Sequence, residues 1–164
     1  MSTTTSTSPN SRNSLLRLSV IGGLIIGLLH IIIQLGIVFS LIGGTPLTSI
    51  LQYIASGIMG EAAYAGGFTT ALLGLIFELV MTIIIAGIFV FSADRISLLR
   101  NNAIVGSLLY GFGVFVVMNF IVLPLSAAPA LPPPAMWLLI EMILEHLLLI
   151  GLPLGILVQR KANK

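Results

Sequence analysis

The chain has 164 residues, of which 57% are hydrophobic and only 7% are charged, and its mean hydropathy is +1.16. A water-soluble domain has about 25% charged residues, so this composition excludes a soluble enzyme and a disordered tail protein. The net charge of +2 indicates no nucleic-acid partner. Because the chain has no cysteine, disulfides, thiolate metal sites and a cysteine nucleophile are excluded. We therefore expect an all-α, polytopic membrane protein whose first partner is the lipid bilayer.

The first residues differ in composition from the rest of the chain. They are rich in serine and threonine and carry few apolar side chains, which predicts a disordered cytoplasmic tail over residues 1–14. Arg12 and Arg17 precede an apolar run, as basic residues do in a signal peptide. That run is longer than the roughly 7–15 residues of a signal peptide's apolar region, and no small-residue cleavage site follows it. We expect it to be retained as the first span of a single transmembrane domain, residues 15–164.

Four apolar runs are long enough to cross a hydrocarbon core of about 30 Å, which takes about 20 helical residues. In lipid every backbone amide needs a partner within the protein, so these runs are predicted to be helices. The predicted spans cover residues 18–42, 68–91, 103–123 and 136–158. We expect them to pack as an antiparallel four-helix bundle.

The connection between the first two spans contains a shorter helix signal. Thr45 and Pro46 fit a helix start with proline at the first helical position, and they predict a helix over residues 46–60. Apolar side chains recur on one face and polar ones on the other: Leu47, Ile50, Leu51, Ile54 and Ile58 opposite Ser49, Gln52 and Ser56. This helix is too short to span, so we expect it to lie along the outer interface or to dip partway into it. It is either a packed interfacial helix or a lid over an external cavity.

The basic residues are distributed on one side of the predicted spans. All seven lie before the first span, between the second and third, or after the fourth: Arg12, Arg17, Arg95, Arg100, Arg160, Lys161 and Lys164. The other two connections contain none. By the positive-inside rule, this distribution predicts that both termini and the middle loop face the cytoplasm.

Several polar side chains fall inside the predicted spans, where an ionised one costs about 2.5–3.5 kcal/mol. They are His30, Gln34, Glu78, Asn119, Glu141, Glu145 and His146. Counted at about 1.5 Å of rise per residue from the outer end of each span, their depths range from about 6 to about 18 Å. None lies in the cytoplasmic half, which consists of leucine, isoleucine, valine and phenylalanine. We therefore predict a polar cluster that opens toward the outer surface.

Small residues share a face with these polar groups on the first two spans. One stripe contains Gly23, Gly27, His30 and Gln34, and the other contains Gly67, Ala71, Gly74, Glu78 and Thr82. Small residues let membrane helices approach closely, and polar residues bond across the contact. The two stripes predict that the helices pack and that His30 meets Glu78. Such a pair either fixes the register of the two helices or handles protons.

On the fourth span, Glu141 and Glu145 share one face, and His146 is turned about 100° away from Glu145. Paired carboxylates can share a proton or hold a cation; alternatively, Glu141 reaches external water and Glu145 bonds to a neighbour. The similar depths of His30 and His146 leave ligation of a haem by two histidines open. A histidine in a membrane more often pairs with a polar neighbour, so we expect no metal and no cofactor.

Four segments carry a resemblance to other proteins. They are LQYIASGIMGEAAYAGG at 51–67, ALLGL at 71–75, VMNFIVLPLS at 117–126 and GLP at 151–153. With these segments the chain resembles a family of small four-helix inner-membrane proteins of bacteria that has no assigned activity. The resemblance implies compartment and topology and no chemistry. Members tend to have an acid at the position of His30 and a histidine at that of Glu78, so the two are exchanged in this chain.

Three functions are compatible with these features. The first is a non-enzymatic accessory or structural subunit that associates through its helices with other membrane proteins or with itself. The second is a proton- or cation-coupled carrier that uses the outward cluster of glutamates and histidines. The third, a membrane redox or hydrolytic enzyme, lacks a ligand set or nucleophile, and we expect no catalytic residue.

Overall fold

The computed structural model describes residues 9–162, which are helical and contain no strand. In chain order the elements are α1 (Pro9–Leu29), η1 (His30–Ile42), α2 (Leu47–Met59), α3 (Ala62–Ala65), α4 (Gly67–Arg95), α5 (Ser97–Asn101), α6 (Ala103–Val117), η2 (Met118–Val122), α7 (Leu123–Leu125), α8 (Met136–Glu145), η3 (His146–Gly151) and α9 (Leu152–Ala162). The three η elements are π-helical continuations of the α-helices that precede them. The all-α prediction is therefore confirmed for the described part of the chain.

Four continuous helices are long and apolar enough to cross a membrane: Arg12–Ile42, Gly67–Arg95, Ala103–Leu125 and Met136–Ala162. Each predicted span lies inside one of these helices. The prediction of four helices long enough to cross a membrane is therefore confirmed. The second and fourth helices extend beyond the apolar runs and end in turns that carry basic side chains. Positive charge interacts favourably with the C-terminal end of a helix, so these polar extensions remain helical outside the apolar stretch.

The N-terminal boundary differs from the prediction. Helix α1 begins at Pro9, so residues 9–14, which were expected to be disordered, are helical. Proline has no N–H to leave unpaired and its φ suits the first turn, so it is a favourable first residue for this helix. The other part of the predicted tail, residues 1–8, lies outside the described residues, as does Lys164.

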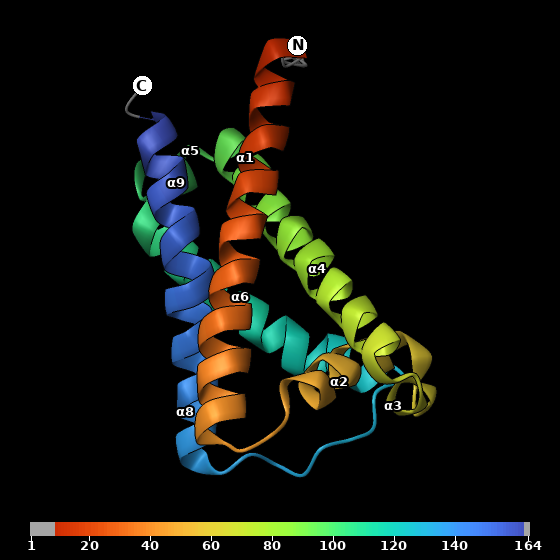
Figure 1. The fold of residues 1–164 in the computed structure, drawn as a ribbon. Helices are drawn as coiled ribbons and strands as arrows, with labels where there is room; N and C mark the ends of the chain where they lie inside the picture. The colour runs from red at the N-terminus through yellow and green to blue at the C-terminus, as the bar shows by residue number, and fades with distance from the viewer. Residues whose placement is uncertain (1–8, 163–164) are drawn as a thin grey trace.

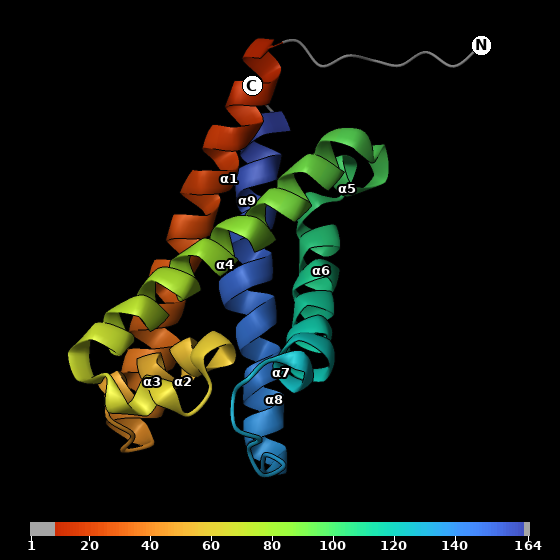
Figure 2. The same ribbon diagram turned by 90° about the vertical axis from the view of Figure 1, so that its right-hand side faces the viewer.

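The four long helices pack as two pairs. Helix α1 lies along α4, and α6 lies against η3 and α9, while α9 also contacts α1 and α4 (Figures 1 and 2). The start of α1, the end of α9 and the short helix α5 lie at one end of the molecule, and α2, α3 and α8 lie at the other (Figure 1). All basic residues that the structure describes therefore lie at the end where the chain starts and finishes.

The main apolar core lies where the two pairs meet. It contains Leu15, Ile26, Ile85, Ala86, Phe89, Val90, Ala93, Ala103, Val114, Ile150, Leu154 and Val158. Phe89 is fully buried and its ring lies 5.1 Å from that of Tyr110, measured between centroids. The Tyr110 hydroxyl donates to the Ile85 carbonyl at 2.7 Å, so this polar group is satisfied inside the core. The core consequently closes the half of the molecule nearer the termini.

Helix α2 lies within the segment predicted to be helical, residues 46–60, and its buried face mixes polar and apolar side chains. Gln52 and Ser56 are buried together with Leu51, whereas Ile58 is 71% exposed. Helices α2 and α4 touch through backbone, because a Cβ on Gly74 would lie 1.9 Å from the Leu51 carbonyl oxygen. Gln52 donates to the carbonyl of Gly67 at 3.0 Å. The predicted apolar face is therefore divided, since Leu51 packs in a small core and Ile58 is exposed.

The connection between α7 and α8 is attached to α2. The N–H of Ala127 donates to the Gly57 carbonyl at 2.9 Å. Helix α2 ends at Gly60, whose φ of 59° is a conformation that favours glycine. A backbone hydrogen bond therefore joins the α7–α8 segment to α2 at the end of the molecule opposite the termini (Figure 2).

Candidate functional site

Three of the long helices change winding beside polar residues. The first helix becomes π-helical at His30, the fourth at His146, and the third at Met118, next to Asn119. A π-helical turn closes hydrogen bonds from residue i to i+5, so it contains more residues per turn and rotates the following side chains away from their α-helical faces. Such turns are concentrated at functional sites. In this chain the π-helical segments begin within one residue of His30, Asn119 and His146, which are polar residues of the long helices.

His30 and Glu78 meet, as the two small-residue stripes predict. The Nδ1 atom of His30 lies 2.7 Å from Oε1 of Glu78, and the two side chains are 20% and 13% exposed. Gly23 and Gly27 make this approach possible. A Cβ on Gly23 would lie 2.3 Å from Cα of Ile83 on α4, so no larger residue fits without moving the helix backbone. The pair therefore bridges α4 and the junction of α1 with η1.

Glu145 joins this pair from the fourth helix. Its Oε1 lies 3.6 Å from Nε2 of His30, and its side chain is only 4% exposed. This oxygen is buried and has no hydrogen-bond partner among residues 9–162. His30 thus points one ring nitrogen at each of two carboxylates, on α4 and on α8. A buried carboxylate oxygen without a donor is costly, so this atom is where a proton or a cation would be most stabilising.

His146 extends the chain of polar contacts by one residue. Its Nδ1 contacts Oε2 of Glu145 and lies 2.8 Å from the Met142 carbonyl oxygen, to which it donates. Glu145 and His146 are neighbours in the chain, and their side chains touch although helical geometry turns them about 100° apart. The described order of contacts is Glu78, His30, Glu145, His146, and it crosses three helices.

A second polar contact lies one turn from the first. The Gln34 amide donates to Oε2 of Glu141 at 3.0 Å, and Gln34 is only 2% exposed. It joins η1 to α8 on the same side as the contact of His30 with Glu145. The structure thereby brings together six of the seven predicted cluster residues, and each makes at least one polar contact with another member.

Asn119 does not join this network within the described chain. Its amide donates to the Phe115 carbonyl of its own helix at 2.9 Å. The third helix instead contributes an aromatic contact, since the Phe115 ring lies edge-on to that of His146 with centroids 5.5 Å apart. Asparagine often bonds back to the carbonyl four residues earlier, which removes the need for a partner on another helix. Sequence pattern carried no signal for the Phe115 contact.

The predicted packing residues divide into three roles. Gly23 and Gly27 lie against α4, as expected, while Gly74 and Ala71 pack against α2 rather than α1. Gly67 has open space around its Cβ position and a φ of 56°, so it serves the turn into α4 and not a packing contact. These differences arise because α2 covers the outer part of the α4 stripe.

A second seam of small residues was not predicted. Cβ atoms on Gly111 and Gly151 would lie 2.5 Å from the His146 carbonyl oxygen and 2.6 Å from that of Ser107. A Cβ on Gly155 would lie 2.3 Å from the Ser107 hydroxyl. The spacing of four residues in Ser107–Gly111 and in Gly151–Gly155 is the signal that could have identified it.

The cluster offers no arrangement of ligands for a metal. Within residues 9–162, no three histidine, aspartate or glutamate side chains are grouped closely enough to hold an ion. Haem ligation by His30 and His146 does not fit this geometry either, because His30 directs both nitrogens to carboxylates and Nδ1 of His146 contacts a carboxylate and a carbonyl. What the arrangement can do is hold helices together and exchange protons between neighbouring carboxylates and imidazoles.

Comparisons with protein-family models, with curated proteins and with solved structures give no match for this chain. The resemblance noted in the sequence therefore rests on its motifs alone.

Proposed function

We propose that the chain is a multi-pass protein of the inner (plasma) membrane whose four long helices cross the bilayer as an antiparallel bundle. The N terminus, the C terminus and α5 face the cytoplasm, and α2 lies along the outer surface. The placement of the basic residues at one end of the molecule supports this orientation. Tags after Lys164 and beside Arg95 should be protected or accessible together in intact cells. Opposite accessibility would contradict the topology.

In this membrane the protein acts as a non-enzymatic accessory or structural subunit through helix association. The observation that carries this proposal is that six polar side chains of the long helices contact one another across three helices. Polar side chains that bond between helices hold a bundle in one arrangement. The outward surface of the long helices is apolar, with Ile32, Phe120 and Leu109 more than half exposed.

Native electrophoresis after extraction in a mild detergent tests the subunit proposal. We expect the protein to migrate with a larger assembly, composed of itself or of other membrane proteins. The same sample in a denaturing detergent provides the control for size. Migration as a lone monomer under the mildest extraction that solubilises it would overturn the proposal.

The chain of contacts from Glu78 to His146 favours a second candidate, a proton- or cation-coupled carrier. Four ionisable residues contact one another in a row, and one buried carboxylate oxygen among them has no hydrogen-bond partner in the described residues. Rows of this kind are relays that move protons inside membranes. The apolar core between this relay and the cytoplasmic end would have to open by helix movement or through a second copy.

Proton flux in liposomes separates this candidate from the first. Glu78→Gln and Glu145→Gln should each abolish flux if the carrier proposal is correct. Glu61→Gln is the matched control, because Glu61 precedes α3 and contacts none of the relay residues. Flux equal in all three variants and in the original chain would eliminate the carrier.

A further inference from the structure

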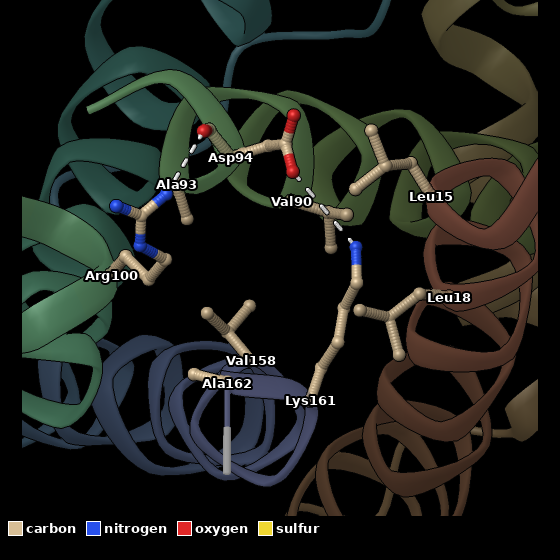
Figure 3. A pocket seen from close by; sticks show the side chains of 9 residues that line it. All are labelled: Leu15, Leu18, Val90, Ala93, Asp94, Arg100, Val158, Lys161 and Ala162. Atoms are coloured by element: carbon tan, nitrogen blue, oxygen red, sulfur yellow. Dashed lines mark hydrogen bonds and ion pairs between the residues drawn. The ribbon is translucent and has the colours of Figure 1, made fainter. Parts of the chain in front are cut away.

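The end of the molecule that contains both termini has two cavities with different charge. The first is about 170 Å³ and is lined by residues of α1, α4, α5 and α9 (Figure 3). In it Lys161 Nζ lies 4.0 Å from Oδ1 of Asp94, and Arg100 donates to the Asp94 carbonyl at 3.4 Å. Asp94, the one side-chain carboxylate at this end among the described residues, is therefore already paired with Lys161.

The second cavity is a groove of about 570 Å³ between α1 and α9. It is lined by Asn13, Ser14, Arg17, Leu18, Ile21, Leu157, Arg160 and Lys161. Arg17 and Arg160 have no carboxylate partner among the described residues. The groove consequently holds two unneutralised guanidinium groups from two helices, together with the amide of Asn13 and the hydroxyl of Ser14.

The apolar lining lies one helical turn deeper than the cations. Ile21 follows Arg17 by four residues, and Leu157 precedes Lys161 by four, so each pair shares a helix face. On both helices the basic residue is nearer the end of the molecule and the apolar residue nearer the middle. The groove is therefore basic at its mouth and apolar along its inner part.

We infer that this groove binds one anionic phospholipid of the cytoplasmic leaflet, with its phosphate between Arg17 and Arg160 and an acyl chain along Ile21 and Leu157. Guanidinium groups bind phosphate through paired hydrogen bonds, and basic grooves between membrane helices on the cytoplasmic side recognise anionic headgroups. A free phosphate would use the mouth alone, whereas a lipid also covers the apolar lining. The inference rests on the proposed membrane location and not on the subunit or carrier roles.

Titration of the detergent-purified chain with phosphatidylglycerol tests the site, with bound lipid counted by native mass spectrometry. Phosphatidylcholine tests the need for negative charge, and glycerol phosphate tests the need for acyl chains. We expect one tightly bound phosphatidylglycerol, with phosphatidylcholine and glycerol phosphate much weaker. Equal binding of phosphatidylcholine would overturn the charge argument, and equal binding of glycerol phosphate would overturn the lipid assignment.

The double variant Arg17→Gln/Arg160→Gln should bind phosphatidylglycerol about 30-fold more weakly, or about fivefold for each charge removed. Arg12→Gln/Arg95→Gln removes the same charge from residues that do not line the groove and should bind normally. If both double variants bound phosphatidylglycerol equally weakly, the affinity would depend on general surface charge and not on this groove, and the proposed site would be wrong.

The conservative variant Arg17→Lys/Arg160→Lys guards against loss of folding, since it keeps both charges and should bind within a fewfold of the original. If the glutamine double variant fails to fold, the two single variants carry the same test at fivefold each. A folded monomer that inserts into liposomes but shows no preference for anionic lipid would refute this inference alone. A chain that fails to insert would refute the membrane proposal instead.

Discussion

Both helix pairs have glycines where their helices touch, but they differ in the side chains at the end of that contact farther from the termini. The seam between α1 and α4 brings Gly23 against the backbone of Ile83 and ends in the contact of His30 with Glu78. The seam of α6 with η3 and α9 brings Gly151 against the Ser107 carbonyl. Within the described residues, helix α6 supplies no carboxylate, histidine or basic side chain to it.

This difference separates two functions of small and polar residues in a membrane. Glycines determine how near two helices can lie, and both pairs use them for that purpose. A polar contact between two specific side chains also fixes which residues lie opposite each other. Among the described residues, such a contact joins the two helices of the first pair, between His30 and Glu78. The third helix is therefore held by shape and by the hydrogen bond from Tyr110 to the Ile85 carbonyl, while the first, second and fourth are also held by contacts between histidine and glutamate side chains.

Replacing His30 by leucine should produce the largest loss of stability. His30 alone contacts carboxylates on two other helices, so its removal leaves Glu78 and Glu145 without their shared partner. We expect the free energy of unfolding to fall by about 3 kcal/mol, the lower end of the range for breaking a buried pair, because the carboxylates can take up protons. Unfolding in mixed micelles with increasing sodium dodecyl sulfate measures it.

His146→Leu is the matched comparison for that variant, since Glu145 keeps His30 when His146 is removed. Its loss should be smaller than that of His30→Leu. A loss as large in His146→Leu would show that the charge network is not centred on His30.

Gly23→Ala should have the next largest effect. The new Cβ would lie 2.3 Å from a backbone atom of α4, so the two helices must separate. Overpacking of this kind costs about 2 kcal/mol. The same unfolding assay applies. If the free energy of unfolding fell by less than a few tenths of a kcal/mol, α1 and α4 would not lie at this distance.

Gly155→Ala should cost about 1 kcal/mol, less than Gly23→Ala, because the nearest atom is the Ser107 side-chain oxygen. Adding Ser107→Ala to the same chain should recover part of the loss. An unchanged loss in the double variant would locate the clash in the backbone of α6 instead.

Gly113→Ala should have the smallest effect and the opposite sign. No atom lies within 4 Å of its Cβ position, and alanine favours a helix over glycine by up to about 1 kcal/mol. It therefore controls for the change from glycine to alanine itself. A clear destabilisation would indicate that this face of α6 is packed against another molecule in the micelle.

Much of this arrangement could be predicted from the sequence because hydropathy and glycine spacing act locally. The four long helices follow from the lengths of the apolar runs, and the meeting of His30 with Glu78 follows from equal depth and shared stripes. The contact of His146 with Glu145 could not be predicted, because neighbouring residues of a helix point in different directions. Asn119 donates to the Phe115 carbonyl of its own helix, a bond that competes with bonding between helices and that its pattern does not reveal.

The burial of polar side chains on α2 could not be predicted from its pattern either, because only Leu51 of the predicted apolar face is buried. A polar group is tolerated in the interior when it is hydrogen-bonded. Gln52 and Ser56 could be buried because they find partners, in the Gly67 carbonyl and in the Tyr53 carbonyl at 2.7 Å. The backbone contact at Gly74 then selects the side of α2 with the smaller side chains.

The bond between Ala127 and Gly57 has a mechanical consequence. It couples the segment before α8 to α2, and α2 is in turn in backbone contact with α4 through Gly74. A ligand or neighbouring protein that tilts α2 would therefore strain two of the long helices at once. Since those helices carry Glu78 and Glu145, a force on α2 reaches both carboxylates that flank His30.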